Sequence, residues 1–71
     1  MNDKLISRIH VDPDKRSGKP CILGTRITIY DIFSYITSGM SLEEILNDFD
    51  YLSIEDIKAC LIYMIKYEGQ N

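Results

Sequence analysis

The chain has 71 residues, a net charge of −3 and a hydrophobic fraction of 45%. A domain of this size buries only about 60% of the surface that its unfolded chain exposes, so we expect oligomerisation to supplement its small core. Two cysteines and one histidine do not make a disulfide framework or a metal cluster, and no cofactor is indicated. No apolar run approaches the ~20 residues of a membrane span, and no signal-peptide pattern is present, so we expect a cytoplasmic protein with no membrane association.

Charge is divided unevenly along the chain. Residues 1–28 carry six basic and three acidic side chains, whereas residues 29–71 carry two basic and eight acidic ones. A polyanion such as DNA is therefore attracted to the N-terminal third and repelled by the rest.

The N-terminal part, residues 5–28, is predicted to form a short β-hairpin with a glycine-rich loop. Apolar and polar side chains alternate in the strand predicted from Leu5 to Asp12, and Asp12-Pro13 ends it. Thr25 to Thr28 is long enough to pair with this strand as the second arm of the hairpin.

The loop between the two arms is predicted to have a specified shape and a binding role. Gly18 and Gly24 tolerate positive φ, and Pro20 fixes its own φ. We expect the following residues to contact nucleic acid or a partner protein: Arg8, Lys19, Thr25 and Arg26. A local role for Arg26, pairing with Asp12 or a helix C-terminus, is an equal alternative because a guanidinium suits both uses.

Catalytic and metal-binding roles find little support in the sequence. Cys60 lies in an apolar helical pattern and is expected to be a buried thiol, and Cys21 is expected to pack in a turn rather than to react. His10, Asp12 and Cys21 lack the repeated spacing of a metal site. No nucleophile, base and orienting residue occur in a recognisable order, so we expect the protein not to be an enzyme.

Three amphipathic helices are predicted over the remaining part of the single domain, residues 29–67. Thr28, Ser41 and Ser53 are the expected N-caps, with an acidic residue three positions after each of them, and Gly39 is the expected C-terminal cap of the first helix. The predicted core faces comprise Ile29, Ile32, Phe33 and Ile36 in the first helix, Leu42, Ile45, Leu46 and Phe49 in the second, and Ile54, Ile57, Leu61, Met64 and Ile65 in the third. The predicted fold is therefore mainly α, a three-helix bundle with a helix-turn-helix layout. The last residues, from Glu68, are expected to fray.

The third helix is a poor candidate for a DNA-recognition helix and a good one for a protein interface. Glu55 and Asp56 stand at its start, where a recognition helix would meet DNA, and carboxylates are repelled by phosphates. Beside its core face, Ile62, Tyr63 and Tyr67 form a second apolar strip, which we expect to form a homodimer interface. The alternative is that the tyrosines cover the domain's own core.

The segment Gly18 to Ile27, preceded by Asp12-Pro13 and followed by Gly39 to Ile45, resembles the small bacterial proteins catalogued as domain of unknown function 433. The resemblance runs from Arg8 to Tyr63. It implies a homeodomain-like helix-turn-helix fold and, as in many members, a role as antitoxin to a PIN-like ribonuclease toxin. The step Gly24-Thr25-Arg26 recurs in that family at this position.

The expected function is therefore an antitoxin that neutralises such a toxin and represses its own operon. Only about four residues follow the third helix, so toxin binding is expected to use the hairpin, the loop or the helical surface. Two alternatives remain open from the sequence: a DNA-binding regulator with no toxin partner, and a purely structural dimer.

Overall fold

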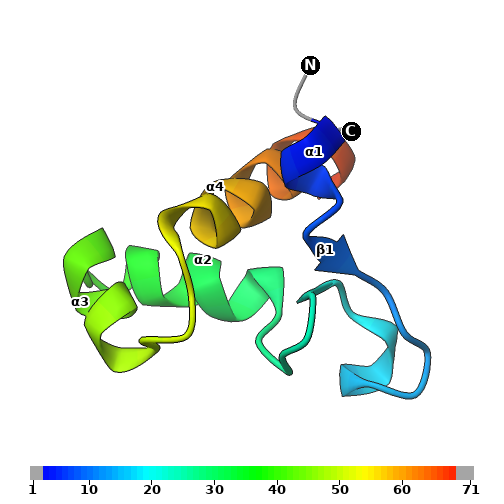
Figure 1. The fold of residues 1–71 in the computed structure, drawn as a ribbon, viewed down its shortest axis with the longest axis horizontal. Coiled ribbons are helices and arrows are strands. Elements are labelled where there is room, and N and C mark those ends of the chain that lie inside the picture. The colour runs from blue at the N-terminus through cyan, green and yellow to red at the C-terminus, as the bar shows by residue number, and fades with distance from the viewer. Residues whose placement is uncertain (1–2, 69–71) are drawn as a thin grey trace.

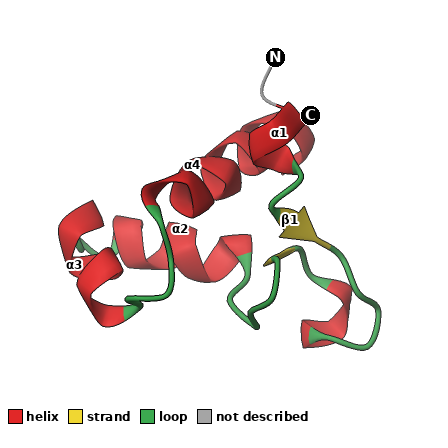
Figure 2. Cartoon of the chain, viewed as in Figure 1, coloured by secondary structure: helices red, strands yellow, loops and turns green. Residues whose placement is uncertain are grey.

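The structure, a computed structural model that describes residues 3–68, is mainly helical with one short antiparallel pair of strands near the N-terminus (Figure 2). The elements in chain order are α1 (Asp3–Ile6), β1 (Ile9–His10), the 3-10 turn η1 (Arg16–Gly18), β2 (Cys21–Ile22), α2 (Ile29–Thr37), α3 (Leu42–Asp48), α4 (Ile54–Tyr63) and the π-helical turn η2 (Met64–Glu68), which continues α4. Of the end that was expected to fray, Glu68 is the last residue of η2, and residues 69–71 lie outside the described residues. No helix within residues 3–68 has the length and apolar character needed to cross a membrane.

Helices α2, α3 and α4 form the predicted three-helix bundle, and each begins at the predicted cap. Thr28, Ser41 and Ser53 each accept a hydrogen bond from the third helical N–H, and the acidic side chain there accepts one from the N–H of the cap residue. The hydrogen bond to the capping hydroxyl is longest in α4, where the Asp56 N–H donates to Ser53 Oγ at 3.3 Å. These reciprocal bonds fix the three helix starts independently of the core.

Helix α2 ends in the predicted left-handed glycine cap. Gly39 has φ of +105°, its N–H donates to the carbonyl of Ile36 at 3.1 Å, and the Met40 N–H donates to the carbonyl of Tyr35 at 3.1 Å. This pair of bonds is the Schellman arrangement, which satisfies the last carbonyls of the helix and turns the chain toward α3.

One core holds the helices and the strand pair together. Its buried side chains are Ile22, Ile27, Ile29, Ile32, Ile45, Leu52, Ile57 and Cys60. Tyr35 of α2 packs at the edge of this core and stacks on Phe49, with 5.5 Å between the ring centroids.

Three side chains predicted to lie in the core are exposed instead. Phe33 is 44% exposed, although Ile29 and Ile32 of the same helix are fully buried, so it lies at the edge of the buried stripe of α2. Leu42 is exposed because it stands at the first residue of α3, outside the core. Ile65 lies in the π-helical turn, where i→i+5 hydrogen bonds widen the helix and rotate the side chain away from the α-helical stripe.

The predicted strand from Leu5 to Asp12 is wrong over most of its length. Asp3–Ile6 form the helical turn α1, and only Ile9–His10 form a strand. Leu5 and Ile6 are both half-buried, and α1 packs against α4. Figure 1 shows the two helices. This contact with a distant segment outweighs the local alternation of apolar and polar residues.

The hairpin is confirmed, but its pairing differs from the prediction. β1 pairs with β2, with Ile9 opposite Ile22 and His10 opposite Cys21. The predicted second arm, Thr25 to Thr28, lies on the other side of β2, where Ile22 N–H donates to the carbonyl of Ile27 at 2.9 Å and Cys21 bridges Thr28. The tight turn around Gly24 brings the chain back beside β2, so β2 lies between β1 and the segment from Thr25 to Thr28.

Candidate functional site

The candidate site is the segment from residue 15 to residue 26, here called the basic loop. It carries Lys15, Arg16, Lys19 and Arg26 and no acidic residue. It contains η1, β2 and the turn that leads back toward α2.

A tight turn around Gly24 sets the second half of the basic loop. Gly24 has φ of +80°, and the Thr25 N–H donates to the carbonyl of Ile22 at 2.9 Å. A positive φ at the third residue of the turn is typical of type II geometry, which selects glycine there. The Thr25 hydroxyl donates to the same carbonyl at 2.8 Å and accepts the Ile27 N–H at 3.0 Å. Thr25, which the sequence offered as a contact residue, thus uses its hydroxyl inside the turn.

The first half of the basic loop is strained. Arg16 and Ser17 have φ of +50° and +60°, and Gly18 follows with +79°. A left-handed conformation costs a non-glycine residue about 1–2 kcal/mol, so other interactions must hold Arg16 and Ser17 in place. Pro20, after the strained residues, is buried, and its carbonyl accepts the Ile29 N–H at 3.0 Å.

Arg16 supplies the strongest of these interactions. Its guanidinium donates to the carbonyl of Arg26 at 2.7 Å and to the carboxylate of Asp31 at 3.0 Å. Lys15 adds a bond from its ammonium to the carbonyl of Thr25 at 3.3 Å. Both cations thus join the two halves of the basic loop, and Arg16 also joins it to the first turn of α2.

The carboxylate of Asp31 pairs with Arg16 and also takes part in the N-terminal cap of α2. Its carboxylate accepts the N–H of Thr28 at 3.0 Å as well as the Arg16 guanidinium. Partial burial by itself raises the pKa of Asp31, but the hydrogen bonds from Thr28 and Arg16 outweigh it and lower the pKa below its usual value of 3.8. No role for Arg16 was expected from the sequence, although Asp31 is the only acidic residue of α2 and indicated a basic partner.

Of the four cations of the basic loop, Lys19 and Arg26 are the two whose charged groups are not used inside the loop. Both side chains are exposed, and neither makes an ion pair or a hydrogen bond with any residue in the described range 3–68. The alternative in which Arg26 pairs with Asp12 is therefore not what the structure has. The Asp12 carboxylate instead accepts the N–H of Asp14 at 2.9 Å. The structural role considered for Arg26 belongs to Arg16.

Arg8 lies outside the basic loop and already has a partner. Its guanidinium donates to the Asp56 carboxylate at 3.1 Å, at the N-terminal cap of α4. Its carbonyl accepts the N–H of Leu23 at 2.7 Å, which ties the N-terminal segment to the basic loop. Arg8 thus connects elements of the fold, and its side chain is less available to a ligand than those of Lys19 and Arg26.

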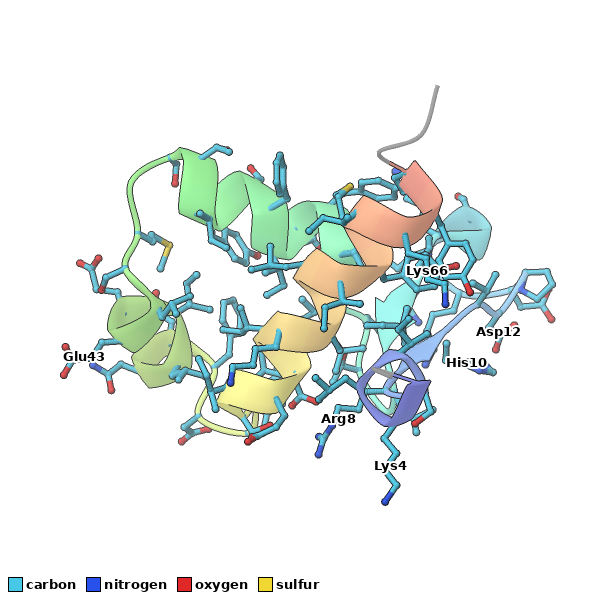
Figure 3. The ribbon with its side chains drawn as sticks, turned by 90° about the horizontal axis from the view of Figure 1, so that it is seen from above. Lys4, Arg8, His10, Asp12, Glu43 and Lys66 are labelled. Atoms are coloured by element: carbon cyan, nitrogen blue, oxygen red, sulfur yellow. The ribbon has the colours of Figure 1, made fainter. Side chains whose placement is uncertain are left out.

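Charge is also divided in space. Glu43 of α3 lies at one end of the molecule, away from Lys4 and Arg8 (Figure 3). The stretch from α3 to the start of α4 carries acidic residues and no basic one from residue 42 to residue 57. A polyanion that reaches this molecule is therefore directed away from the α3–α4 turn and toward the N-terminal segments.

Both thiols are packing residues in this structure. Cys21 is 2% exposed, and its thiol donates to the carbonyl of Lys19 at 3.4 Å. Cys60 is 1% exposed, and burial, followed by the charge of Asp56, raises its pKa to about 12. Among residues 3–68, no three His, Cys, Asp or Glu side chains are placed to hold a metal ion.

The second apolar strip divides into a covered and an uncovered part. Ile62 and Tyr63 are half-buried, and Tyr63 packs against the core. Tyr67 is 54% exposed and contacts Tyr63, with 4.6 Å between the ring centroids. Both tyrosines were expected at a dimer interface, with cover of the domain's own core as the alternative; Tyr63 packs against the core, whereas Tyr67 is exposed beside it.

The fold is a three-helix bundle with a helix-turn-helix layout and an N-terminal strand pair, and the basic loop carries two exposed cations, Lys19 and Arg26. Residues 9–64 match the family model described as protein of unknown function (DUF433). The chain therefore belongs to the DUF433 family.

Two bacterial proteins are similar to this chain. The solved structure of a DUF433 member from Anabaena variabilis is similar to this chain with a TM-score of 0.85 and 26% sequence identity, over 96% of this chain and 67% of that one. An uncharacterized protein, y4eO, of Sinorhizobium fredii is 35% identical over 51 residues, which are 72% of this chain. The match spans only 23% of the length of y4eO, so the domain forms a minor part of that protein.

Proposed function

We propose that this domain is a non-catalytic antitoxin that uses its basic loop to cover the acidic site of a PIN-like ribonuclease. The observation that carries the proposal is the exposure of Lys19 and Arg26 on a loop whose other two cations, Lys15 and Arg16, fix its shape. A rigid loop loses little conformational entropy on binding, and cations without internal partners lose no ion pair.

Charge complementarity explains why an acidic nuclease site suits this loop. A nuclease of this class gathers carboxylates to hold divalent cations, and these carboxylates attract a lysine and an arginine that replace the metal charge. A guanidinium also binds a carboxylate through two parallel hydrogen bonds, which favours Arg26 as the residue that enters the site.

The test uses the product of the gene beside this protein's own gene, which the proposal expects to be a ribonuclease that this domain inhibits. The wild-type domain is expected to copurify with that nuclease and to inhibit its cleavage of RNA. The double variant Lys19→Ala with Arg26→Ala should raise the inhibition constant by at least about tenfold, because it removes two charge-assisted contacts. The matched control, Lys4→Ala with Lys58→Ala, removes two exposed cations outside the basic loop and should inhibit like the wild type.

Equal inhibition by the two double variants would show that the basic loop does not cover the nuclease site. Failure of the wild-type domain to bind or inhibit the nuclease would remove the antitoxin function itself.

A second candidate, DNA binding, is favoured by the same unpaired cations, since phosphates are the other common ligand of exposed Lys and Arg. In an antitoxin, such binding to the upstream DNA would repress the operon. Gel-shift titrations at two salt concentrations test it. The Lys19→Ala/Arg26→Ala variant should then flatten the salt dependence by about one unit of slope per lost phosphate contact, and Glu55→Ala should bind as well as the wild type or better. DNA binding without nuclease inhibition would make the domain a regulator with no toxin, and loss of binding in Glu55→Ala would place the DNA on α4.

A further inference from the structure

The end of the basic loop is a four-residue segment, residues 23–26, which we call the loop tip. A hydrogen bond from the Ile22 N–H to the carbonyl of Ile27 at 2.9 Å encloses it. Leu23 and Arg26 occupy its first and last positions, and both side chains are exposed. The two residues between them are a glycine and a threonine whose hydroxyl is used inside the turn. The loop tip therefore presents one apolar side chain and one guanidinium.

Leu23 differs from the other large apolar side chains of the basic loop because it lies in water. It is 60% exposed, whereas Ile22 beside it is 3% exposed, and Ile27, just after the loop, is 8% exposed. A single exposed leucine is ordinary on a protein surface, so its exposure alone assigns no role to Leu23. The way in which its backbone is held supplies the second observation.

Hydrogen bonds from outside the loop tip hold the backbone at three of its four residues. They join the Leu23 N–H to the carbonyl of Arg8 at 2.7 Å, the Lys15 ammonium to the carbonyl of Thr25 at 3.3 Å, and the Arg16 guanidinium to the carbonyl of Arg26 at 2.7 Å. All three bonds use backbone groups of the tip, and the Arg26 guanidinium forms no ion pair within residues 3–68. The tip is thus fixed before it binds, which lowers the entropy lost on association.

We propose that Leu23 and Arg26 form a two-part anchor for a protein partner whose surface has an apolar pocket bordered by carboxylates. This inference rests on the proposed function and adds to it a binding role for Leu23, which the cations alone do not require.

Charge and hydrophobicity together favour a protein as the occupant. The basic loop has no acidic residue, so a partner surface rich in carboxylates meets no like charge there. A pocket that covers Arg26 also covers Leu23, because the two residues stand at the two ends of the same short, fixed tip. DNA affinity comes mainly from phosphate contacts, which use the arginine and gain nothing from a leucine.

The experiment measures binding to the product of the neighbouring gene by titration calorimetry. Leu23→Ala should raise the dissociation constant by at least about tenfold, because it removes most of the apolar contact. Leu23→Lys should weaken binding at least as much, although it adds a positive charge. Leu42→Ala and Leu42→Lys are the matched controls, since Leu42 is a leucine 43% exposed on α3, and they should bind like the wild type.

A second titration uses duplex DNA from upstream of this protein's own gene. Electrostatic binding to phosphates predicts the opposite sign: Leu23→Lys should tighten it or leave it unchanged, and Leu23→Ala should have no effect. Helical circular dichroism that matches the wild type shows that each variant is folded.

A wild-type domain that does not bind the neighbouring product would remove the antitoxin function and this anchor with it. If the wild type binds that product, and Leu23→Ala binds equally well or Leu23→Lys binds more tightly, the anchor is wrong while the antitoxin function stands. Equal weakening by the Leu23 and Leu42 variants would also overturn the anchor.

Discussion

The guanidinium of Arg16 lies 3.0 Å from the carboxylate of Asp31, and this contact joins the basic loop to the first turn of α2. Arg16 holds a backbone conformation that is unfavourable for a residue with a side chain, with φ of +50°. Asp31 in turn accepts the Thr28 N–H, so one carboxylate stabilises both the start of a helix and the shape of the loop. The loop conformation and the helix cap should therefore be energetically coupled.

A double-mutant cycle with Arg16→Ala and Asp31→Asn measures that coupling. We expect a coupling free energy of about 0.5–1 kcal/mol, since both side chains are partly exposed to water. Urea denaturation midpoints provide the values. Arg16→Gly is the control, because it loses the same contacts as Arg16→Ala while relieving the left-handed strain, and it should be more stable than Arg16→Ala by about 1 kcal/mol. Strict additivity in the cycle would mean that the two residues act separately.

The contribution of Asp31 should depend on pH in a defined direction. Its folded-state pKa lies below the ordinary value of 3.8, so folding favours the ionised carboxylate. The stability that this provides is complete above the unfolded-state pKa and is lost as the pH falls through the folded-state pKa. The wild type should therefore lose stability relative to Asp31→Asn below about pH 4, as measured by urea denaturation at several pH values. A difference that stays constant down to pH 2 would contradict the assignment.

A substitution at Gly24 is expected to lower the stability of the fold more than a substitution at Lys19, an exposed residue of the same loop. A Cβ at Gly24 would meet no atom within 4 Å, so the cost of a substitution comes from φ of +80° alone. Gly24→Val should cost about 1–3 kcal/mol and Gly24→Asn less, because asparagine tolerates this conformation. Lys19→Ala should have almost no effect. Thermal or urea unfolding decides the matter, and equal shifts for Gly24→Val and Lys19→Ala would refute the turn geometry.

Asp56 should contribute more to stability than the equivalent cap residue of α3. Its carboxylate accepts the Ser53 N–H at 2.9 Å and also pairs with Arg8. Glu44 closes the same kind of capping box on α3 at an exposed position. Asp56→Ala should cost about 1–2 kcal/mol, more than the matched Glu44→Ala, while Arg8→Ala should cost less than about 1 kcal/mol. Urea unfolding of the three variants tests the order, and a larger loss in Glu44→Ala would reverse it.

The buried thiol of Cys60 should be chemically inert in the folded protein. Burial raises its pKa to about 12, so the reactive thiolate is scarce at neutral pH. A thiol reagent at pH 8 should therefore modify neither Cys60 nor the buried Cys21 until urea is added, when both should react. Mass spectrometry of the modified sites provides the measurement. Rapid labelling of Cys60 under native conditions would show that α4 opens readily.

The cap signals in the sequence determined the three helices. Ser41 with Glu44 and Ser53 with Asp56 act on N–H groups within one turn, so no distant residue is needed to place the helix start. The positive φ of Gly39 and Gly24 could be predicted for the same reason, because the conformation of a tight turn or helix cap is a local requirement. These interactions depend only on neighbours in the chain.

Tertiary structure alone decided the partners of each surface. Leu5 and Ile6 became helical beside α4, and Phe33 is 44% exposed although Ile29, one turn before it on α2, is fully buried. The same holds for Arg16, whose partner Asp31 is 15 positions away in the chain. The hydrophobic periodicity of the sequence predicts that a helix has an apolar stripe. Which part of that stripe is buried depends on the angle at which two helices pack, because all the contacting side chains together set that angle.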